Sequence, residues 1–453
     1  MNKPTKTRSP WLFVPSLYFQ QGVPVIIVQQ VSVILYKKLG IPNDQIGLWT
    51  SLIIWPWILK MFWGPLVDLN GRKRDWVLVM QAFVTLALAA CAFAVTTESF
   101  LPITLGIFLL TAFISATHDI ALDGYYMLAL PKDKQAFFMG IRSTFFRLAM
   151  IFGNGALVIL AGWWEKQGVP IAQSWRGAFL VGAAIYGILV IYAWMAMPRI
   201  AADQPSRRMR DATPGTPRDP EVPETPEFIE AIKSFFSQRK IIPILGFILF
   251  YRFGESMLTK MAGPFLLDSR EIGGLGFETQ QVGMILGNVG IFFLVCGGLI
   301  GGILISKYGL RKCVWPMVIT MNLPNLFYVW AAYAQPSATA LYFITAVEQF
   351  SYGFGMASYM VFAMYTCQNS KYSTSHYAIA TALMALGAML AGITSGYLQQ
   401  AVGYFWFFVA VCLSTIPGMI LLKFVPLEAD PETSAPSRKE EICEPTPVPA
   451  GNH

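Results

Sequence analysis

Two short segments of this chain are copies of one pattern, and each follows a long apolar run. Residues 64–74 read GPLVDLNGRKR and residues 302–312 read GILISKYGLRK, with glycines at equivalent positions in both. The apolar runs before them open on related stretches, NDQIG at 43–47 and TQQVG at 279–283. A chain whose halves repeat in this way is built by duplication. Among membrane proteins, this duplication is typical of carriers with two matched halves.

The composition places the chain in a membrane. Hydrophobic residues make up 55% of the 453 positions and charged residues 13%, whereas a soluble domain carries about 25% charged residues. The apolar stretch after the basic start is long enough to span and has no small-residue cleavage site, so we expect no cleaved signal peptide. Six cysteines without paired spacing and three scattered histidines predict neither disulfides nor a metal site, and we expect no cofactor.

Twelve apolar runs are each long enough to cross a hydrocarbon core of about 30 Å as a helix. They predict an all-α membrane protein with two pseudo-symmetric six-helix bundles. The predicted spans are 12–36, 46–67, 76–95, 101–129, 136–161, 175–197, 241–267, 280–305, 313–333, 338–365, 374–400 and 403–425.

A polar segment rich in proline, arginine and glutamate separates the two sets of spans. We therefore predict an N-terminal bundle at 1–197, a cytoplasmic linker at 198–240, a C-terminal bundle at 241–425 and a tail at 426–453. Disorder is expected in the tail and in the first part of the linker. The stretch 226–238 is expected to form a short amphipathic helix at the membrane surface.

The distribution of basic residues predicts the orientation. With both termini placed in the cytoplasm, the inside segments hold 23 of the 33 lysines and arginines, and the outside segments hold five. This bias follows the positive-inside rule, so we expect both termini to be cytoplasmic. It also explains the net charge of +7 without nucleic acid as a partner.

Six plus six helices, a long central loop and the repeated short loop resemble the major facilitator superfamily. The signature loop of that superfamily is matched here by Gly64, Asp68, Gly71, Arg72 and Lys73. We expect Gly64 to allow close helix approach and Gly71 to make the turn. Asp68 is expected to pair across the seam between the halves as a cytoplasmic gate. Ser306 takes the place of this aspartate in the second copy.

Several charged residues fall inside the predicted spans, where each costs about 2.5–3.5 kcal/mol on insertion scales unless it is paired or faces a polar cavity. Asp119 and Asp123 share one face of the fourth helix. Matched depths in the fifth helix predict two ion pairs, Asp123–Arg142 and Asp119–Arg147. These pairs either hold the two helices together or act as switches that exchange a partner for a proton or a solute.

The seventh and tenth helices add further charges. Arg252 and Glu255 share one face of the seventh helix, and Glu348 lies beside Gln349 in the tenth. In the superfamily's architecture, helices one, four, seven and ten line the central cavity, which implies that Asp119, Glu255 and Glu348 reach it. We expect these carboxyl groups to take part in proton coupling; the alternative for Glu348 is a buried, neutral hydrogen-bonding group.

A polar, partly anionic solute would need cations, amides and aromatic rings around it. Helix-to-helix hydrogen bonding and ordinary packing are the alternatives for the amides and the rings. The predicted substrate-binding residues are Lys60, Arg252, Lys260, Gln20, Gln21, Tyr125 and Gln349.

At the fourth and fifth helices the resemblance narrows. SATHDIALDGYYMLALPKDK (115–134) and GIRSTFFRLAMIFGNGALVILAG (140–162) resemble the muropeptide permease (AmpG-like) family, which belongs to the peptide–acetyl-coenzyme A transporter group of the superfamily. The resemblance covers both halves. It implies proton-driven import of anhydro-muropeptide across the cell inner membrane. His118, Arg252, Glu255 and the pair Tyr125–Tyr126 depart from the family's usual residues.

The sequence therefore predicts a proton-coupled importer that works as a monomer, with protons, a small solute and the lipid bilayer as its partners and with no catalytic residue. A siderophore or acyl-coenzyme A carrier of the same superfamily is the nearest alternative. A membrane-embedded acyltransferase would need a His–Asp pair, for which His118–Asp119 is the only candidate. A non-transporting sensor would keep the repeat without needing the buried charges.

Overall fold

A computed structural model describes residues 9–200, 203, 225–238, 240–368 and 372–427. Helices are the only regular secondary structure among these residues, as the all-α prediction requires. Nearly all of the expected tail, and most of the part of the expected linker that was predicted to be disordered, lie outside them. The side chain of Asp68 is also outside the description.

The described residues of the first half form ten α-helices, two short 3-10 helices and two π-helical segments. In chain order they are η1 (Pro10–Leu12), α1 (Val14–Ile26), η2 (Ile27–Val31), α2 (Ser32–Lys38), α3 (Asn43–Leu52), α4 (Trp55–Leu59), η3 (Lys60–Phe62), α5 (Gly64–Leu69), α6 (Lys73–Ala94), α7 (Phe100–Ala129), α8 (Lys132–Met150), η4 (Ile151–Leu157), α9 (Val158–Lys166) and α10 (Ile171–Ala196). The π-helical segments are η2 and η4.

The described residues of the second half follow the same plan after a short helix in the linker. The elements are α12 (Thr225–Phe236), α13 (Ile241–Phe250), α14 (Phe253–Leu267), η5 (Arg270–Ile272), α15 (Thr279–Val282), the π-helical η6 (Gly283–Gly290), α16 (Ile291–Tyr308), α17 (Leu310–Asn322), α18 (Asn325–Ala334), α19 (Ala338–Gln368), α20 (Ser373–Ser414) and α21 (Ile416–Leu421).

Eight helices of the described residues are long and apolar enough to cross a membrane by length and composition. The predicted spans at 374–400 and 403–425 overlap one of them, Ser375–Leu421, which bends at Gly403 with a φ of 75°. The predicted spans at 46–67 and 313–333 are divided into shorter helices beside Pro56, Pro65 and Pro324. Proline removes a backbone donor and clashes with the preceding turn, so helix breaks are expected there.

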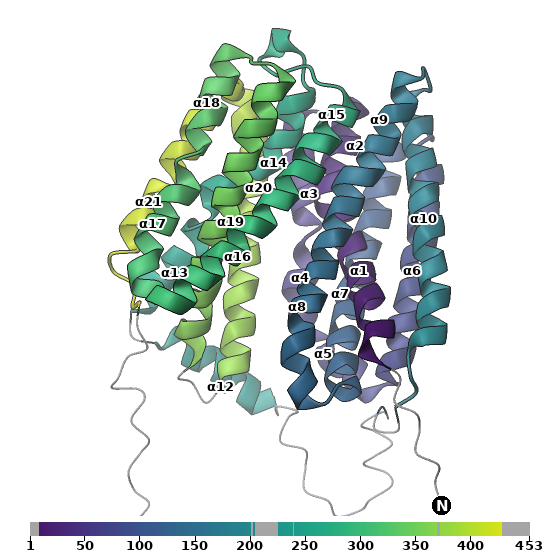
Figure 1. Ribbon diagram of the computed structural model, residues 1–453, viewed down its shortest axis with the longest axis vertical. Coiled ribbons are helices and arrows are strands. Elements are labelled where there is room, and N and C mark those ends of the chain that lie inside the picture. The colour runs from purple at the N-terminus through teal and green to yellow at the C-terminus, as the bar shows by residue number, and fades with distance from the viewer. Residues whose placement is uncertain (1–8, 201–202, 204–224, 239, 369–371, 428–453) are drawn as a thin grey trace, which may run out of the picture.

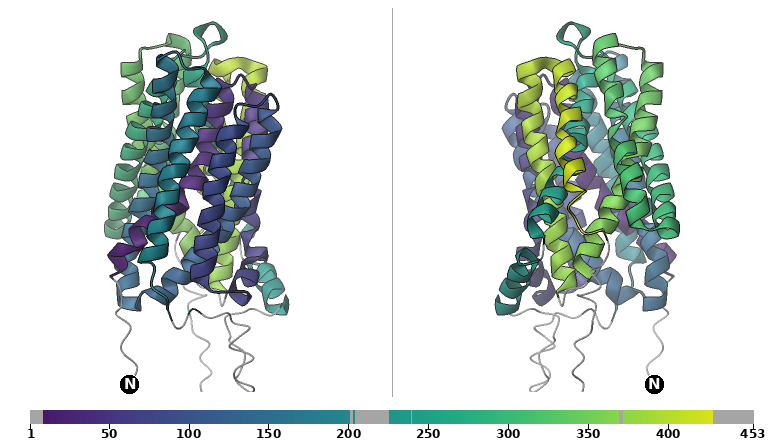
Figure 2. Two further views of the ribbon diagram at one scale, coloured as in Figure 1. Left: turned by 90° about the vertical axis from the view of Figure 1, so that its right-hand side faces the viewer. Right: turned by 90° about the vertical axis from the view of Figure 1, so that its left-hand side faces the viewer.

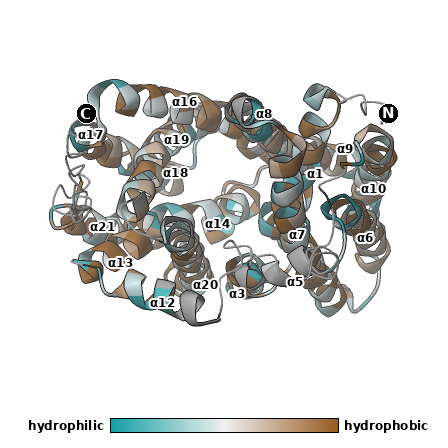
Figure 3. Ribbon diagram, turned by 90° about the horizontal axis from the view of Figure 1, so that it is seen from below, coloured by the Kyte–Doolittle hydropathy of each residue, from teal (hydrophilic) through white to brown (hydrophobic). Residues whose placement is uncertain are grey.

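The two halves form two groups of helices that stand side by side (Figure 1). Seen from below, α1 and α5 to α10 lie on one side and α13, α16 to α19 and α21 on the other, with α3, α14 and α20 near the middle (Figure 3). We call the end that is lower in Figure 1, where α5 and α12 lie, the linker end. The opposite end, where α9, α15 and α18 lie, is called the distal end. The side views show α12 at the linker end, beyond the main group of helices (Figure 2).

The buried apolar side chains show where the halves are joined. One large core contains residues of both halves, from Val23 in α1 to Val411 in α20. A second core, around Phe247 and Met317, lies within the second half, and a third, around Tyr18 and Leu122, lies within the first. The halves therefore share a core in part of the molecule and have separate cores elsewhere.

Helix α12 confirms the short helix that was predicted in the linker. Phe235 at its end is completely buried and meets the ring of His376 edge to face, with the ring centroids 5.4 Å apart. Gln238 lies 3.3 Å from Nδ1 of the same histidine. These contacts attach the linker helix to the start of α20.

Candidate functional site

The charged residues of α7 are neutralised by close partners. Asp119 forms an ion pair with Lys60 and accepts a hydrogen bond from Gln21 on α1. One turn along, Asp123 pairs with Arg142 on α8 at 2.7 Å and accepts a hydrogen bond from the Tyr18 hydroxyl at 3.2 Å. Each carboxylate therefore has a cation and one further donor.

The predicted Asp123–Arg142 pair is confirmed, and its arginine also contacts two tyrosine rings. The Arg142 carbon Cζ lies 4.3 Å from the centroid of the Tyr18 ring and 5.3 Å from that of the Tyr126 ring. Cation–π contacts of this kind add to the ion pair. The arrangement fixes the side chain of Arg142 between α1, α7 and α8.

The predicted Asp119–Arg147 pair is wrong, because α1 lies between α7 and α8 at this depth. Gln21 of α1 contacts Asp119 on one side. On the other side Gly22 packs so tightly on α8 that a Cβ at this position would come within 2.9 Å of the Phe146 carbonyl oxygen. Arg147 instead extends toward Gly298 of α16, and no described carboxylate lies within 4.0 Å of it.

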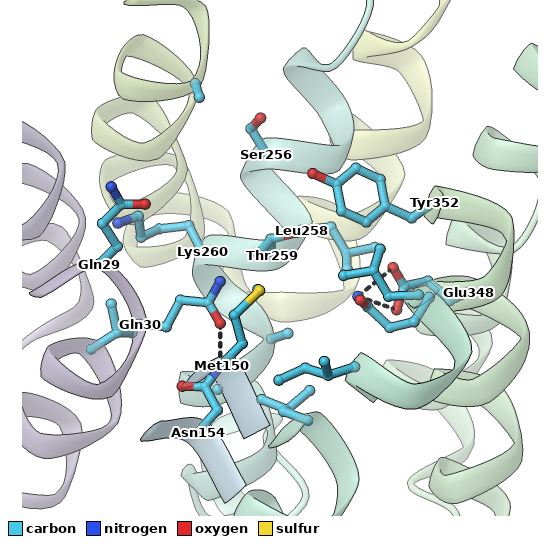
Figure 4. Close-up of a pocket in the computed structure, with 18 of the residues that line it drawn as sticks. Gln29, Gln30, Met150, Asn154, Ser256, Leu258, Thr259, Lys260, Glu348 and Tyr352 are labelled. Atoms are coloured by element: carbon cyan, nitrogen blue, oxygen red, sulfur yellow. Dashed lines mark hydrogen bonds between the residues drawn. The ribbon is translucent and has the colours of Figure 1, made fainter. Parts of the chain in front are cut away.

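A cavity of about 240 Å³ lies between the two halves (Figure 4). It is lined from the first half by η2, by α2, by Ile54 and by the junction of α8 with η4. From the second half it is lined by α14 and the residue before it, by η6, by α16, by Tyr328 of α18, by α19 and by Ala388 of α20. The polar groups on its wall are Gln29, Gln30, Asn154, Arg252, Ser256, Thr259, Lys260, Tyr328, Glu348, Gln349 and Tyr352.

Of the predicted substrate-binding residues, Arg252, Lys260 and Gln349 lie on this wall. The others lie elsewhere because the first half uses their polar groups internally. Lys60 and Gln21 bind Asp119, and Gln20 donates to main-chain oxygens of Ser16 and Leu189. Tyr125 is completely buried and donates to the carbonyl of Pro198 at 2.9 Å. Asp119 does not reach the wall either, so the seventh and tenth helices carry the charges of the cavity.

The two cations on the wall have no described carboxylate within 4.0 Å. Lys260 donates to the Thr50 hydroxyl at 3.1 Å across the seam between the halves. Arg252 donates to the Tyr352 hydroxyl, and its Cζ lies 5.2 Å from the centroid of that ring. The expected proximity of Arg252 and Glu255 therefore does not produce an ion pair. Figure 4 shows Lys260 beside Gln29 on one side of the cavity and Tyr352 near Glu348 on the other.

The main chain is irregular where it meets the cavity. The seventh pass is interrupted between α13 and α14, and Arg252 is the residue before the first turn of α14. Gln29 and Gln30 lie in η2, and Asn154, which donates to Gln30, lies in η4. Interrupted helices and π-helical turns are common where a membrane helix lines a binding site.

Glu255 and Glu348 are the most deeply buried charged-type side chains near the cavity, each about 1% exposed. Their carboxyl groups interact directly with one another. Gln349 donates to both oxygens of Glu348, at 3.0 and 3.1 Å. Sequence reasoning chose both glutamates but gave no sign of their contact, since they lie on helices far apart in the chain.

The distal end contains a seam that sequence reasoning missed. Asp268, at the end of α14, forms an ion pair with Lys37 at 2.5 Å and accepts from the Tyr404 hydroxyl at 2.6 Å. Asn43 donates to Gln399 at 2.6 Å and to Tyr404 at 2.9 Å. These groups connect helices of both halves. Among the described side chains, the hydrogen bonds and ion pairs between the halves lie at this end or, as for Lys260 and Thr50, near the cavity.

Small residues bring the helices together along the same seam. A Cβ at Gly47 of α3 would come within 2.8 Å of the Gly392 carbonyl oxygen in α20, and one at Gly287 would meet the backbone of Gly155 at 2.3 Å. Close contact between small residues is the usual basis of tight helix packing in membranes. The distal ends of the halves are therefore in direct backbone contact.

The repeated loop is held within the first half. Asp203 accepts hydrogen bonds from the backbone amides of Lys73 and Arg74, at 2.7 and 3.0 Å, which satisfies the start of α6. Arg74 also donates to the carbonyls of Trp194 and Met197. The predicted turn at Gly71 is confirmed by its φ of 107°. The gate pairing expected of Asp68 falls outside the described side chains.

The His118–Asp119 sequence is not arranged as a catalytic pair. The His118 ring is completely buried, and its Nε2 lies 3.2 Å from the amide of Gln81. Asp119 turns instead to Lys60 and Gln21. The buried histidine is thus part of the packing between α6 and α7.

Comparison with known proteins agrees with this architecture. The family model for the Major Facilitator Superfamily matches residues 17–375. The anhydromuropeptide permease of Escherichia coli K12 is 25% identical over 411 residues, which cover 90% of this chain and 77% of the permease. A Haemophilus influenzae protein, whose name states no activity, is 27% identical over 425 residues, with 90% and 92% covered. The expected resemblance to the muropeptide permease family is thereby confirmed.

The fold is also found among solved structures. The nucleoside transporter NupG superposes with a TM-score of 0.67 at 15% identity, covering 90% of this chain and 97% of that one. The superfamily match covers most of the chain and the E. coli relative is named a permease, so the acyltransferase alternative is set aside. This chain belongs to the major facilitator superfamily and is a multi-pass membrane transporter.

Proposed function

We propose that this transporter imports an anhydro-muropeptide from cell-wall recycling into the cytoplasm, together with protons. The observation that carries the proposal is the cavity between the halves, whose wall presents Arg252 and Lys260 without carboxylate partners. A buried cation without a counter-charge is costly. A ligand that supplies an anionic group would remove that cost on binding.

The chemistry of the wall suits a solute with carboxylates, hydroxyls and amides. Arg252 precedes the first turn of α14, where the positive end of the helix dipole also favours an anion. Gln29, Gln30 and Asn154 on the opposite wall can donate to and accept from sugar hydroxyls and peptide groups. A disaccharide that carries a short peptide has all of these groups, and the E. coli relative is named for such a cargo.

The charge bias and the seam support inward transport. Lysines and arginines are concentrated in the sequence segments that were predicted to be inside, which supports a cytoplasmic location for the linker end and both termini. The distal end, closed by the Asp268 network, then faces the outside of an inner membrane. In this proposal, residues 1–197 and 241–425 act as two bodies that move relative to one another. Contact between them at the distal end is expected of the state that releases its cargo into the cytoplasm.

Uptake of labelled anhydro-muropeptide into cells that lack their own permease tests the proposal directly. Cells that express this chain should accumulate the label, and collapsing the proton gradient should stop the accumulation. Parallel uptake of a ferric siderophore and of an acyl-coenzyme A ester measures the alternative cargoes. Accumulation of either of these without the muropeptide would contradict the proposed cargo.

A further inference from the structure

The contact between Glu255 and Glu348 has no counterpart among the other carboxyl groups described near the cavity. The two side chains come from α14 and α19, and each is about 1% exposed. Neither oxygen of Glu255 has a donor in hydrogen-bond geometry; its neighbours are the Glu348 carboxyl and the Thr259 hydroxyl. Glu348 is the member of the pair that lies on the cavity wall.

Two ionised carboxylates in contact repel each other strongly, and more so away from water. One proton between them removes this repulsion and supplies the missing donor, because a protonated carboxyl can donate to an ionised one. Hydrogen bonds between such groups are short and strong. The geometry therefore favours a pair that holds a proton in common.

The charged and titratable groups that act on this pair come from three helices. Arg252, before α14, lies close enough to attract the negative charge of Glu255, although beyond ion-pair distance. Tyr328 of α18 and Tyr352 of α19 also lie near the pair. Tyr328 is completely buried, and its hydroxyl lies beside Glu348 and Thr345 without a hydrogen bond in good geometry. Lys260 shares the cavity wall with Glu348.

We propose that Glu255 and Glu348 share one proton while the cavity is empty, and that the pair binds a second proton when an anionic group of the cargo occupies Arg252 and Lys260. This rests on the proposed function for the identity of the cargo. The anionic group of the cargo then interacts with the positive charge of Arg252 and Lys260, which had offset the negative charge of the glutamate pair. The remaining negative charge of the pair therefore binds a proton more tightly. By linkage, the proton raises the affinity for the anion by the same factor. One proton thus accompanies each cargo molecule at this site.

The shared proton is tested without any cargo. Infrared spectroscopy of the full chain in lipid nanodiscs follows the carbonyl band of protonated carboxyl groups as the pH is raised. In Glu255→Gln and Glu348→Gln the remaining carboxyl has no like-charged neighbour, so its band should disappear at a lower pH, by about one unit or more. Glu98→Gln, in the exposed loop before α7, is the matched control and should keep the wild-type titration. A wild-type titration in either single variant would overturn the shared proton.

Two further measurements separate the parts of the proposal. Replacing choline chloride by sodium chloride at constant pH should leave the band unchanged; loss of the band would make the pair a sodium site instead. Addition of anhydro-muropeptide in weak buffer should take up about one proton per molecule bound in the wild type and none in Glu348→Gln. Binding without proton uptake in the wild type would overturn the coupling. Absence of binding would contradict the proposed cargo alone, since the infrared titration does not depend on it.

Discussion

The charges of α7 in the first half and those beside the cavity in the second half are arranged in opposite ways. In the first half, Asp119 and Asp123 each have a cation in direct contact, and polar groups of α1 complete their hydrogen bonds. In the second half, Arg252 and Lys260 have no described carboxylate within 4.0 Å, and the two glutamates face each other instead. Paired charges hold helices in place, whereas unpaired ones are available to bind a proton or a solute.

The first prediction removes the unpaired cations of the second half. Arg252→Gln/Lys260→Gln should reduce muropeptide uptake by about a hundredfold or more, because hydrogen bonds to charged groups contribute about 1.5–3 kcal/mol each. Uptake per molecule of transporter in the membrane is the measurement. Arg176→Gln, an exposed arginine that lies over Phe93, serves as the control and should transport normally. Normal uptake in the double variant would contradict a role of these two cations in binding the solute.

The second prediction concerns the paired charges of the first half. Asp119→Asn or Lys60→Gln should each lower the stability of the purified protein by about 1.5–3 kcal/mol, since each leaves a charge without its partner. The double variant should recover more than half of that loss, as expected for groups that interact. Thermal unfolding in one detergent measures all three. Additive losses would show that the two residues do not act as a pair.

The third prediction applies to the seam at the distal end. Asp268→Asn removes the ion pair that joins Lys37 of the first half to the second half and weakens the hydrogen bond from Tyr404. The ratio of distally closed to distally open molecules should fall by about tenfold, which corresponds to 1.4 kcal/mol. Spin labels attached at positions 167 and 333, in a chain depleted of other cysteines, should show a larger population of long label-to-label distances. An unchanged distance distribution would argue against a closing role.

The smallest effect is expected at an exposed pair on the same seam. Lys166 and Glu278 are 3.4 Å apart, with side chains 64% and 56% exposed. Exposed ion pairs contribute about 0–1 kcal/mol. Lys166→Gln should therefore change neither uptake nor the spin-label distances measurably. A large effect would mean that the seam depends on charge at its surface as well as on its buried contacts.

The depth of each charged residue in the membrane was predictable from the sequence, but the direction in which its side chain points around the helix axis was not. Asp123 and Arg142 pair as expected because they lie near the turn at Pro131, where α7 and α8 converge. Asp119 and Arg147 also have matched depths, but α1 separates them. The spacing of residues along one helix cannot show which neighbouring helix stands beside it.

The charges of the second half show the same limit. Arg252, Glu255, Lys260 and Glu348 were all chosen from the cost of charge inside a span, and three of them line the cavity. The Glu255–Glu348 contact depends on how α14 and α19 pack, which no local pattern encodes. Asp268 was missed because it ends a helix at the membrane boundary, where a charge is unremarkable in sequence.

The most direct test of the difference between the halves is accumulation of labelled anhydro-muropeptide in proteoliposomes under an inward proton gradient. The second-half variant Glu348→Gln should lose gradient-driven accumulation, while the first-half variant Lys60→Gln/Asp119→Asn, matched for protein content, should keep at least about half. Gradient-driven accumulation that survives Glu348→Gln and disappears in the first-half variant would contradict the account.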